Sequence, residues 1–307
     1  MIKIDGVTKR FGDFVALDNI SFDINDGAVY GLVGINGAGK STLLRSITGI
    51  YTLDGGSVTM DGEPIADNPA ALSRIAFVAD DLYLPNGYTL LGMASKYRQL
   101  FPHFNNDRFA ELTAAFELDP KKRFGSYSKG MRRQAATILA LSLEADYTFF
   151  DETFDGLDPF KRAYVKRIIK DEVARRGCTV LVTSHSLREL EDICDRLAIL
   201  DGGNIVFESD AAKMVNGGVK VQIAFDGEYG AERFAELDVV DFTKRGSVAT
   251  LVVRGEADEV TEKLRAMSPI LLEILPLGLE EIFSFELSQF GRADLFDSIS
   301  GGENDEK

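Results

Sequence analysis

The amino-acid sequence predicts an α/β fold with a largely parallel sheet, an inserted block of helices and a small α+β unit near the C-terminus. Three observations lead to this prediction. In the first part of the chain, short apolar runs alternate with helix-spaced apolar residues, as is typical of α/β folds. Residues 90–144 are mostly helical in pattern. Near Asn216-Gly217-Gly218 the pattern changes again, and we expect a domain boundary there.

The first part of the chain begins with two expected strands, at residues 1–5 and 20–24, where apolar and polar residues alternate. Residues 29–34 form a short apolar run that ends in glycine, which predicts a buried strand. A helix is expected next, because Leu43, Leu44 and Ile47 are helix-spaced and Gly49 can end the helix.

The inserted block contains three expected helices, at residues 90–100, 109–117 and 131–144. Strands return at residues 147–150, 179–182 and 197–200, and Gly202-Gly203 predicts a hairpin turn. After the boundary we expect strands at residues 219–225, 248–253 and 270–275 and a helix at residues 257–267. The predicted domains are residues 1–216, with the helical subdomain at about 85–145, and residues 217–290, followed by a flexible polar tail at 291–307.

The composition excludes several classes of function. Lys and Arg total 34 against 49 Asp and Glu, a formal net charge of −15. The chain therefore lacks the positive charge that binding to nucleic acid or to anionic lipid requires. No run approaches the roughly 18–20 apolar residues that span a bilayer, so direct membrane insertion is not expected. Cys178 and Cys194 are expected to be buried, reduced thiols.

The strongest chemical signal is a phosphate-binding loop with the sequence GINGAGKS. Its glycines let successive backbone N–H groups surround phosphates, and the helix that follows adds its dipole. Lys40 would neutralise the outer phosphates, and the Ser41 hydroxyl would hold Mg²⁺. The alternative is a glycine-rich turn with a solvated lysine, but a strand before the loop and a helix after it favour phosphate binding. The predicted nucleotide contacts are Gly34, Asn36, Gly37, Gly39, Lys40, Ser41 and Thr42.

A second signal is a pair of carboxylates, Asp151 and Glu152, at the end of the apolar segment Tyr147-Thr-Phe-Phe. Two adjacent buried carboxylates repel each other unless a cation compensates their charge. Asp151 would hold Mg²⁺ through water, and Glu152 would orient or deprotonate the attacking water. Alone, such a pair is more often a solvated loop; downstream of a phosphate loop, the catalytic interpretation is favoured.

Two further positions each allow two interpretations. Ser128, just before the expected helix at residues 131–144, is either a helix cap or, together with Gly130, part of an anion site. His185 follows the strand at residues 179–182 and is either structural or able to hydrogen-bond a phosphate and a water.

Together and in this order, these elements resemble the nucleotide-binding subunit of an ABC transporter over residues 1–216. The phosphate loop resembles Walker A, and the strand ending in Asp151 and Glu152 resembles Walker B with its catalytic glutamate. The resemblance places the signature loop at residues 128–131, the D-loop, with Asp158 as a nucleotide contact, at residues 156–158, and the switch histidine at His185. Phe11 falls where the family stacks an aromatic ring on adenine, and the alternative is an ordinary core aromatic.

The resemblance implies a mechanism and partners. Such subunits bind ATP and Mg²⁺ and work as head-to-tail pairs that trap two ATP molecules between them. The second subunit would be a copy of this chain or a related ATPase. The pore would lie on a separate multi-helix membrane permease, which places this chain in the cytoplasm on the inner face of the cell membrane.

Three positions depart from the family pattern. The signature reads Tyr-Ser-Lys-Gly-Met instead of Leu-Ser-Gly-Gly-Gln, and Thr153 replaces a proline after Walker B. Asp80 occupies the position of a glutamine that touches Mg²⁺ and the membrane subunit, and it could also be a metal ligand. Lys129 and Asp80 resemble a branch of bacterial exporters for antibiotics and peptides, and residues 279–283 resemble the end of that branch's C-terminal extension.

Three functions compete on this basis. The leading one is an ATPase that powers export through a separate permease. The second is an ATP-sensing regulatory module with slow hydrolysis, which the departures at Asp80 and in the signature keep open. The third, a non-transport ABC ATPase acting on ribosomes or DNA, is disfavoured by the single ATPase unit and the acidic charge. The apolar residues 275–287 are expected to form a dimer contact, with a lid on the ATPase core as the alternative.

Overall fold

The computed structural model describes residues 1–210, 218–278, 281–283, 295 and 299. The chain divides into two compact units, Met1–Glu208 and Ser209–Lys307. Of the expected boundary, Asn216 and Gly217 lie outside the described residues and Gly218 begins a strand.

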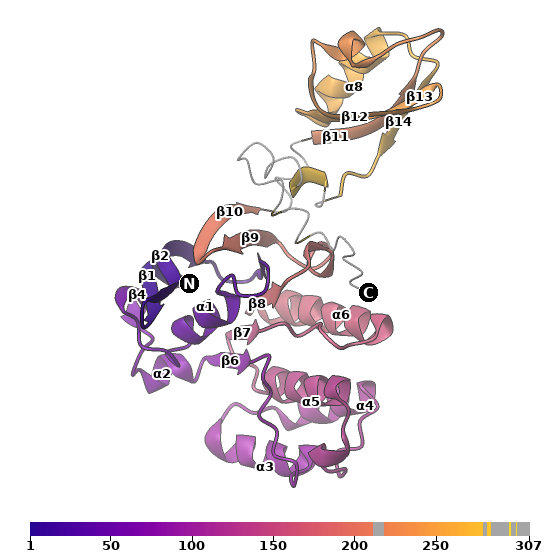
Figure 1. Ribbon diagram of the computed structural model, residues 1–307. Coiled ribbons are helices and arrows are strands. Elements are labelled where there is room, and N and C mark those ends of the chain that lie inside the picture. Colours follow the sequence, from indigo (N-terminus) through magenta and orange to yellow (C-terminus); the bar gives the residue numbers. More distant parts are fainter. Residues whose placement is uncertain (211–217, 279–280, 284–294, 296–298, 300–307) are drawn as a thin grey trace. The chain divides into compact units, whose positions relative to one another are not determined.

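The first unit is built on a six-stranded sheet with the strand order β10-β9-β3-β8-β7-β6 (Figure 1). The pairs β3–β8, β3–β9, β7–β8 and β6–β7 are parallel. Every residue of β3, β7 and β8 is buried, which explains why these strands have continuous apolar sequences with no alternation. The strands are β3 (Val29–Val33), β6 (Ile75–Val78), β7 (Tyr147–Phe150), β8 (Thr179–Ser184), β9 (Arg196–Asp201) and β10 (Asn204–Asp210).

A second, antiparallel sheet has the order β2-β1-β4-β5. Its strands alternate buried and exposed residues, and β1 pairs with β2 in a register that joins Ile2 to Ile24 and Ile4 to Phe22. The buried side chains of this sheet share one apolar core with those of α1 and the central sheet. The elements are β1 (Ile2–Phe11), β2 (Phe14–Ile24), α1 (Lys40–Ile47), β4 (Gly55–Met60), β5 (Glu63–Pro64) and α2 (Pro69–Leu72).

The helical block lies beside the edge of the central sheet that β6 forms (Figure 1). Each of its main helices begins at a polar cap: Thr89, Asn105 and Ser128 accept hydrogen bonds from backbone N–H groups of the first turn. Its elements are α3 (Leu90–Leu100), α4 (Asn106–Ala115), the 3₁₀ turn η1 (Phe124–Ser126) and α5 (Lys129–Ser142).

The longest helix in the described part of the chain, α6 (Pro159–Arg176), was not predicted from the sequence. Its apolar stripe is weak, because the buried face includes Glu172, which is 1% exposed. Glu172 pairs with Arg108 of α4 and, at 3.0 Å, with Arg175. A buried acid with charged partners interrupts the apolar periodicity by which a helix is recognised. The 3₁₀ turn η2 (Leu187–Glu189) follows β8.

The two cysteines are both free and buried, as predicted. Burial raises the pKa of both thiols, and this keeps them protonated. No helix in the described part of the chain is long and apolar enough to cross a membrane.

The second unit contains an antiparallel sheet with the order β12-β13-β11-β14. Buried apolar side chains of the sheet and of α8 form its core. Most of the predicted tail, apart from Leu295 and Ile299, and most of residues 279–287 lie outside the described residues. The elements are β11 (Gly218–Ala224), η3 (Ala231–Phe234), β12 (Asp238–Arg245), β13 (Val248–Arg254), α8 (Ala257–Ala266) and β14 (Leu271–Leu275), of which η3 and β12 were not predicted.

Phe234 is the central aromatic side chain of this second core. It is 1% exposed, and its ring centroid lies 6.0 Å from those of Phe225 and Phe242. We expect Phe234→Ala to lower the free energy of unfolding by about 3–5 kcal/mol, because it leaves a cavity among the rings. Urea unfolding of the full chain measures this. Ile270→Ala, at a side chain that is 71% exposed, is the control and should cost less than about 0.5 kcal/mol; equal losses would contradict this core.

Candidate functional site

The phosphate loop connects β3 to α1, and its glycines are required by close packing and by backbone conformation. A Cβ on Gly34 would lie 2.4 Å from the backbone oxygen of Leu200, and one on Gly39 would lie 2.8 Å from that of Ala16. Gly39 has φ 111° and Gly37 has φ 85°, which L side chains rarely adopt. The loop is therefore pressed against the end of the sheet, with its backbone turned through left-handed conformations.

Lys40 begins α1, and its ammonium group lies inside the loop. The side chain is 5% exposed. Its Nζ donates hydrogen bonds to the backbone oxygens of Gly34, at 2.5 Å, and Ile35, at 3.2 Å. It also pairs with Glu152 Oε1 at 3.0 Å. These oxygens compensate a charge that would be costly to bury alone.

The remaining predicted loop residues lie next to Lys40 in the loop and in the first turn of α1. Ser41 and Thr42 are half-buried in the first turn of α1, and Asn36 is exposed in the loop. The structure therefore brings the predicted loop residues together at the carboxyl end of β3.

Asp151 and Glu152 follow β7, and Thr183 of β8 fixes both. The Thr183 hydroxyl donates to Asp151 Oδ1 at 2.8 Å and accepts from the Glu152 N–H at 3.0 Å. Asp151 is fully buried, whereas the Glu152 side chain is 13% exposed. Glu152 has φ 48°, an uncommon conformation for a residue other than glycine. This turn points the two adjacent carboxylates in different directions.

Glu152 lies between two basic side chains. Its Oε1 contacts Lys40, and its Oε2 lies 3.0 Å from His185 Nδ1. His185 follows the end of β8, and its side chain is 48% exposed. The three predicted catalytic residues, from β3–α1, β7 and β8, are thus in direct contact, as expected where the carboxyl ends of parallel strands meet.

The donor atoms next to Lys40 fit a magnesium ion bound together with phosphates. Asp151 Oδ2 is buried and has no hydrogen-bond partner among the described residues, so it is an acceptor ready for a cation or its water. No group of three or more His, Cys, Asp and Glu side chains in the described part of the chain could hold a metal by itself. Mg²⁺ normally uses one or two carboxylates and completes its shell with phosphates and water. Ser41 and Asp151 fit that pattern.

Asp80 makes a different contact. Its Oδ1 is ion-paired with the guanidinium group of Arg133, which is 1% exposed in α5. The metal-binding role that the sequence suggests for Asp80 stays a prediction; in this structure the carboxylate is the counterion of the buried arginine. Arg133 was not predicted, because an arginine in a helical pattern normally indicates a solvated face.

The signature segment packs on the loop that follows Glu152. Ser128 caps α5 by accepting from the Met131 N–H at 3.2 Å. A Cβ on Gly130 would lie 3.0 Å from the backbone oxygen of Gly156. Lys129 Nζ pairs with Asp155 Oδ2 at 2.7 Å. The cap interpretation of Ser128 is therefore observed, and the anion-binding interpretation is compatible with it.

Two further predicted residues have clear structural settings. Asp158 caps α6, where its Oδ1 accepts from the Lys161 N–H at 3.0 Å. Phe11 is 46% exposed and lies edge-on against Tyr51, with centroids 5.4 Å apart. The alternative that Phe11 is an ordinary core aromatic is therefore wrong, and the adenine contact stays a prediction.

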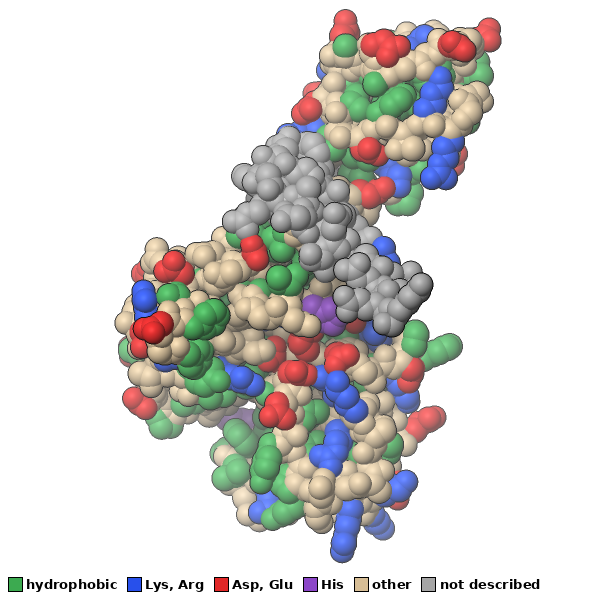
Figure 2. All heavy atoms as spheres, viewed as in Figure 1, with side chains coloured by type: hydrophobic (Ala, Val, Ile, Leu, Met, Phe, Trp, Pro, Cys, Tyr) green, Lys and Arg blue, Asp and Glu red, His purple; other side chains and the backbone are tan. Residues whose placement is uncertain are grey.

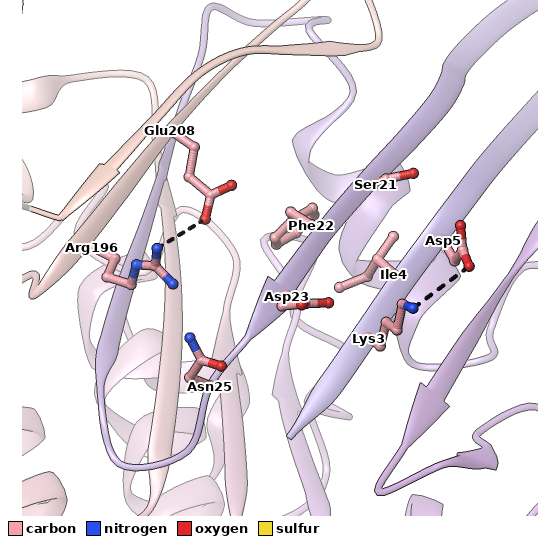
Figure 3. A pocket seen from close by; sticks show the side chains of 9 residues that line it. All are labelled: Lys3, Ile4, Asp5, Ser21, Phe22, Asp23, Asn25, Arg196 and Glu208. Atoms are coloured by element: carbon pink, nitrogen blue, oxygen red, sulfur yellow. Dashed lines mark ion pairs between the residues drawn. The ribbon is translucent and has the colours of Figure 1, made fainter.

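A hollow of about 420 Å³ lies elsewhere on this unit, between the antiparallel sheet and β9–β10 (Figure 3). Four of its charged side chains form two ion pairs, Arg196 with Glu208 at 3.7 Å and Lys3 with Asp5 at 3.9 Å. None of the residues predicted for the nucleotide site lines it.

Thr183 is a functional residue that the sequence analysis missed, although its place at the end of an apolar strand before His185 was a signal. We expect Thr183→Val to cost about 1–3 kcal/mol of unfolding free energy, since a buried acceptor and a buried N–H lose their partner. ATP turnover should fall about tenfold or more, because Thr183 orients both carboxylates. Urea unfolding and steady-state hydrolysis measure the two effects.

The control is Thr179→Val at the other end of β8, where the hydroxyl accepts from the Gly27 N–H at 2.9 Å. This variant should lose similar stability and keep its turnover. An equal loss of turnover in both variants would contradict the role given to Thr183.

Comparisons with known proteins bear on the family and the fold of the chain. The family model of the ABC transporter matches residues 17–155. The ABC transporter ATP-binding protein YtrB of Bacillus subtilis (strain 168) is 28% identical, over 95% of this chain and 98% of that protein. The Nod factor export ATP-binding protein I of Cupriavidus pinatubonensis is 30% identical, over 92% of this chain and 89% of that protein. An Fe(3+) import ATP-binding protein, FbpC 1 of Rhodococcus jostii, is 27% identical, over 94% and 88%.

Among solved structures, a dimeric post-hydrolysis state of the ATP-binding cassette MJ0796 with ADP and phosphate superposes with a TM-score of 0.62. It is 23% identical over 69% of this chain and 99% of that chain, a similarity that establishes the fold. The phosphate loop, the paired carboxylates and the relatives aligned over nearly their full length lead to one conclusion: this chain belongs to the ATP-binding proteins of ABC transporters, the ATPases that couple ATP hydrolysis to transport.

Proposed function

We propose that this ATPase subunit uses Lys40, Glu152 and His185 to hydrolyse ATP with Mg²⁺, and that it powers export through a separate membrane permease. The observation that carries the proposal is the position of Glu152, whose two carboxylate oxygens contact Lys40 and His185 next to the buried Asp151. A carboxylate held by two basic groups at the mouth of a phosphate loop is well placed to orient a water near the terminal phosphate.

Each side chain has a distinct task in this proposal. Lys40 and the loop N–H groups bind the outer phosphates. Ser41 and Asp151 hold Mg²⁺, which supplies positive charge to offset that of the phosphates. Glu152 orients the attacking water and accepts its proton, while His185 fixes the second oxygen of Glu152 and contacts the terminal phosphate. Phe11 stacks on adenine, and its exposed ring supports this role.

We further propose that two subunits pair head to tail, so that Ser128 and Gly130 of one chain close the ATP held by the other, with Asp158 at the same contact. The dimeric form of the cassette MJ0796 supports pairing. The second subunit is a copy of this chain or a related ATPase. This arrangement places the chain at the cytoplasmic face of the membrane, beside the permease.

The direction of transport rests on the relatives and on the signature. The Nod factor protein is named for export, and the FbpC 1 protein is named for iron import. The Lys129 variant of the signature and the acidic residue at position 80 favour the exporter branch. In this family, residues at these two positions touch partners, so they bear on the direction of transport. Overall sequence identity does not, because it is similar for the exporter relative and the importer relative.

A second candidate function is an ATP-sensing module with slow hydrolysis. The observation that favours it is the ion pair between Asp80 and Arg133, which engages the side chain expected at the metal. In this case the chain would bind ATP and pair with a second subunit, and slow hydrolysis would only set the time at which the pair separates.

The first test is steady-state hydrolysis of Mg²⁺-ATP by the purified chain. We expect Glu152→Gln to lose on the order of a hundredfold or more in turnover while it still binds ATP, because only the general base is removed. Lys40→Ala should lose nucleotide binding itself. Glu63→Gln and Lys122→Ala, at exposed positions, are matched controls and should behave like the parent.

A parent that binds ATP but barely hydrolyses it, with Glu152→Gln indistinguishable from it, would refute the motor and favour the sensing module.

The second test concerns direction. Inverted membrane vesicles from the source cells expose the cytoplasmic face, so ATP added outside should drive a compound into the lumen if the complex exports it. Mass spectrometry of the lumen, compared with vesicles that carry Glu152→Gln, identifies an ATP-dependent compound. Depletion of a compound preloaded in the lumen would instead indicate import, and no difference between the vesicles would contradict transport.

A further inference from the structure

Four charged side chains form a continuous network between the signature segment and the loop after Glu152, and we call it the signature clamp: Asp80, Lys129, Arg133 and Asp155. Asp155 Oδ2 accepts from Lys129 Nζ at 2.7 Å and lies 3.5 Å from Arg133 Nη2. The same Nη2 pairs with Asp80 Oδ1. Figure 2 shows acidic and basic side chains gathered where the central sheet approaches the helical block.

Arg133 is the buried member of the clamp. It is 1% exposed, and its Nε and Nη1 atoms have no hydrogen-bond partner among the described residues. Its charge therefore depends on Asp80, just after β6, and on Asp155. A buried guanidinium that loses its carboxylates is strongly unfavourable. The position of α5 is thus tied to the loops that follow β6 and β7.

Backbone contacts also connect the signature segment to the loop that follows Glu152. The Asp155 N–H donates to the Glu152 backbone oxygen at 3.1 Å, so Asp155 belongs to the turn that sets Glu152. Gly156 has φ 73°, and a Cβ there would contact the Lys129 chain at 3.5 Å. With Gly130 against the backbone of Gly156, the two segments have little room to move separately.

We infer that Asp155 is a positioning residue, which holds the signature segment of a chain against the loop that carries Glu152 of the same chain. The inference rests on the proposed head-to-tail pair, in which the signature of one chain closes the ATP of the other. Within that pair, the orientation of Glu152 at one ATP is coupled through Asp155 and Lys129 to closure of the second ATP. In this network, Asp80 is the counterion that holds Arg133 in place.

The ion pair between Lys129 and Asp155 is the exposed contact of the signature clamp. Because it is exposed, we assign it a role in positioning the signature segment and little contribution to stability. The side chains of Lys129 and Asp155 are 67% and 43% exposed, and exposed ion pairs contribute little to folding. The hydrogen bond from Lys129 lowers the pKa of Asp155, with the charges of Arg133 and His185 acting in the same direction. The carboxylate is therefore ionised near neutral pH.

The test is a double-mutant cycle with Lys129→Gln and Asp155→Asn. Each single variant should lower kcat/KM for ATP about fivefold or more, the lower range of coupling between sites, and bring the Hill coefficient from near two toward one. The double variant should lose no more than either single one, because the two residues act through each other. Unfolding by urea should be unchanged in Lys129→Gln, whereas Asp155→Asn should lose some stability because it also removes a carboxylate from the buried Arg133. Lys121→Gln is an exposed control.

A second readout needs no nucleotide. In Asp155→Asn, amide hydrogen exchange should rise in the peptide that covers residues 128–137 and stay unchanged in α1. A parent that does not hydrolyse ATP would refute the proposed function, and the exchange experiment would still report on the clamp. Additive losses, a parent with no cooperativity, or unchanged exchange in residues 128–137 would each overturn the inference.

Discussion

The ion pair between Lys40 and Glu152 joins the phosphate loop after β3 to the carboxylate after β7, across the intervening strand β8. Most of the site is arranged around this contact. Gly34 and Gly39 of the loop fit closely against the backbones of Leu200 and Ala16, and Glu152 adopts a left-handed backbone conformation. Thr183, on the strand between them, fixes the backbone of Glu152 and one oxygen of Asp151. Parallel strand order is the constraint behind this arrangement, since only neighbouring carboxyl ends bring such distant residues together.

Much of this arrangement could be predicted from the sequence, because local patterns carry it. The phosphate loop, the carboxylate pair and His185 each stand at a strand end, and the structure brings them into contact. Polar caps and helix-spaced apolar residues likewise indicated the inserted helices. What the sequence could not give depends on partners distant along the chain. Glu172 removes the apolar stripe of α6 and finds Arg108, and Arg133 is buried only because Asp80 and Asp155 reach it.

The ion pairs of the signature clamp explain two of the departures from the family pattern together. Lys129 and Asp80 differ from the family pattern, and singly they left open a subunit with slow hydrolysis. In the structure Lys129 pairs with Asp155, and Asp80 and Asp155 both compensate the charge of Arg133. Thr153 is the exception: it is buried with a hydroxyl that has no partner among the described residues, and nothing in the structure explains the replacement of proline.

The buried Oδ2 of Asp151 has a consequence for the lifetime of the protein in the cell. A cation or its water that binds this oxygen together with nucleotide stabilises the folded chain and not the unfolded one. Proteases act on chains that have opened, so the fraction of molecules open to degradation falls as ligand is bound.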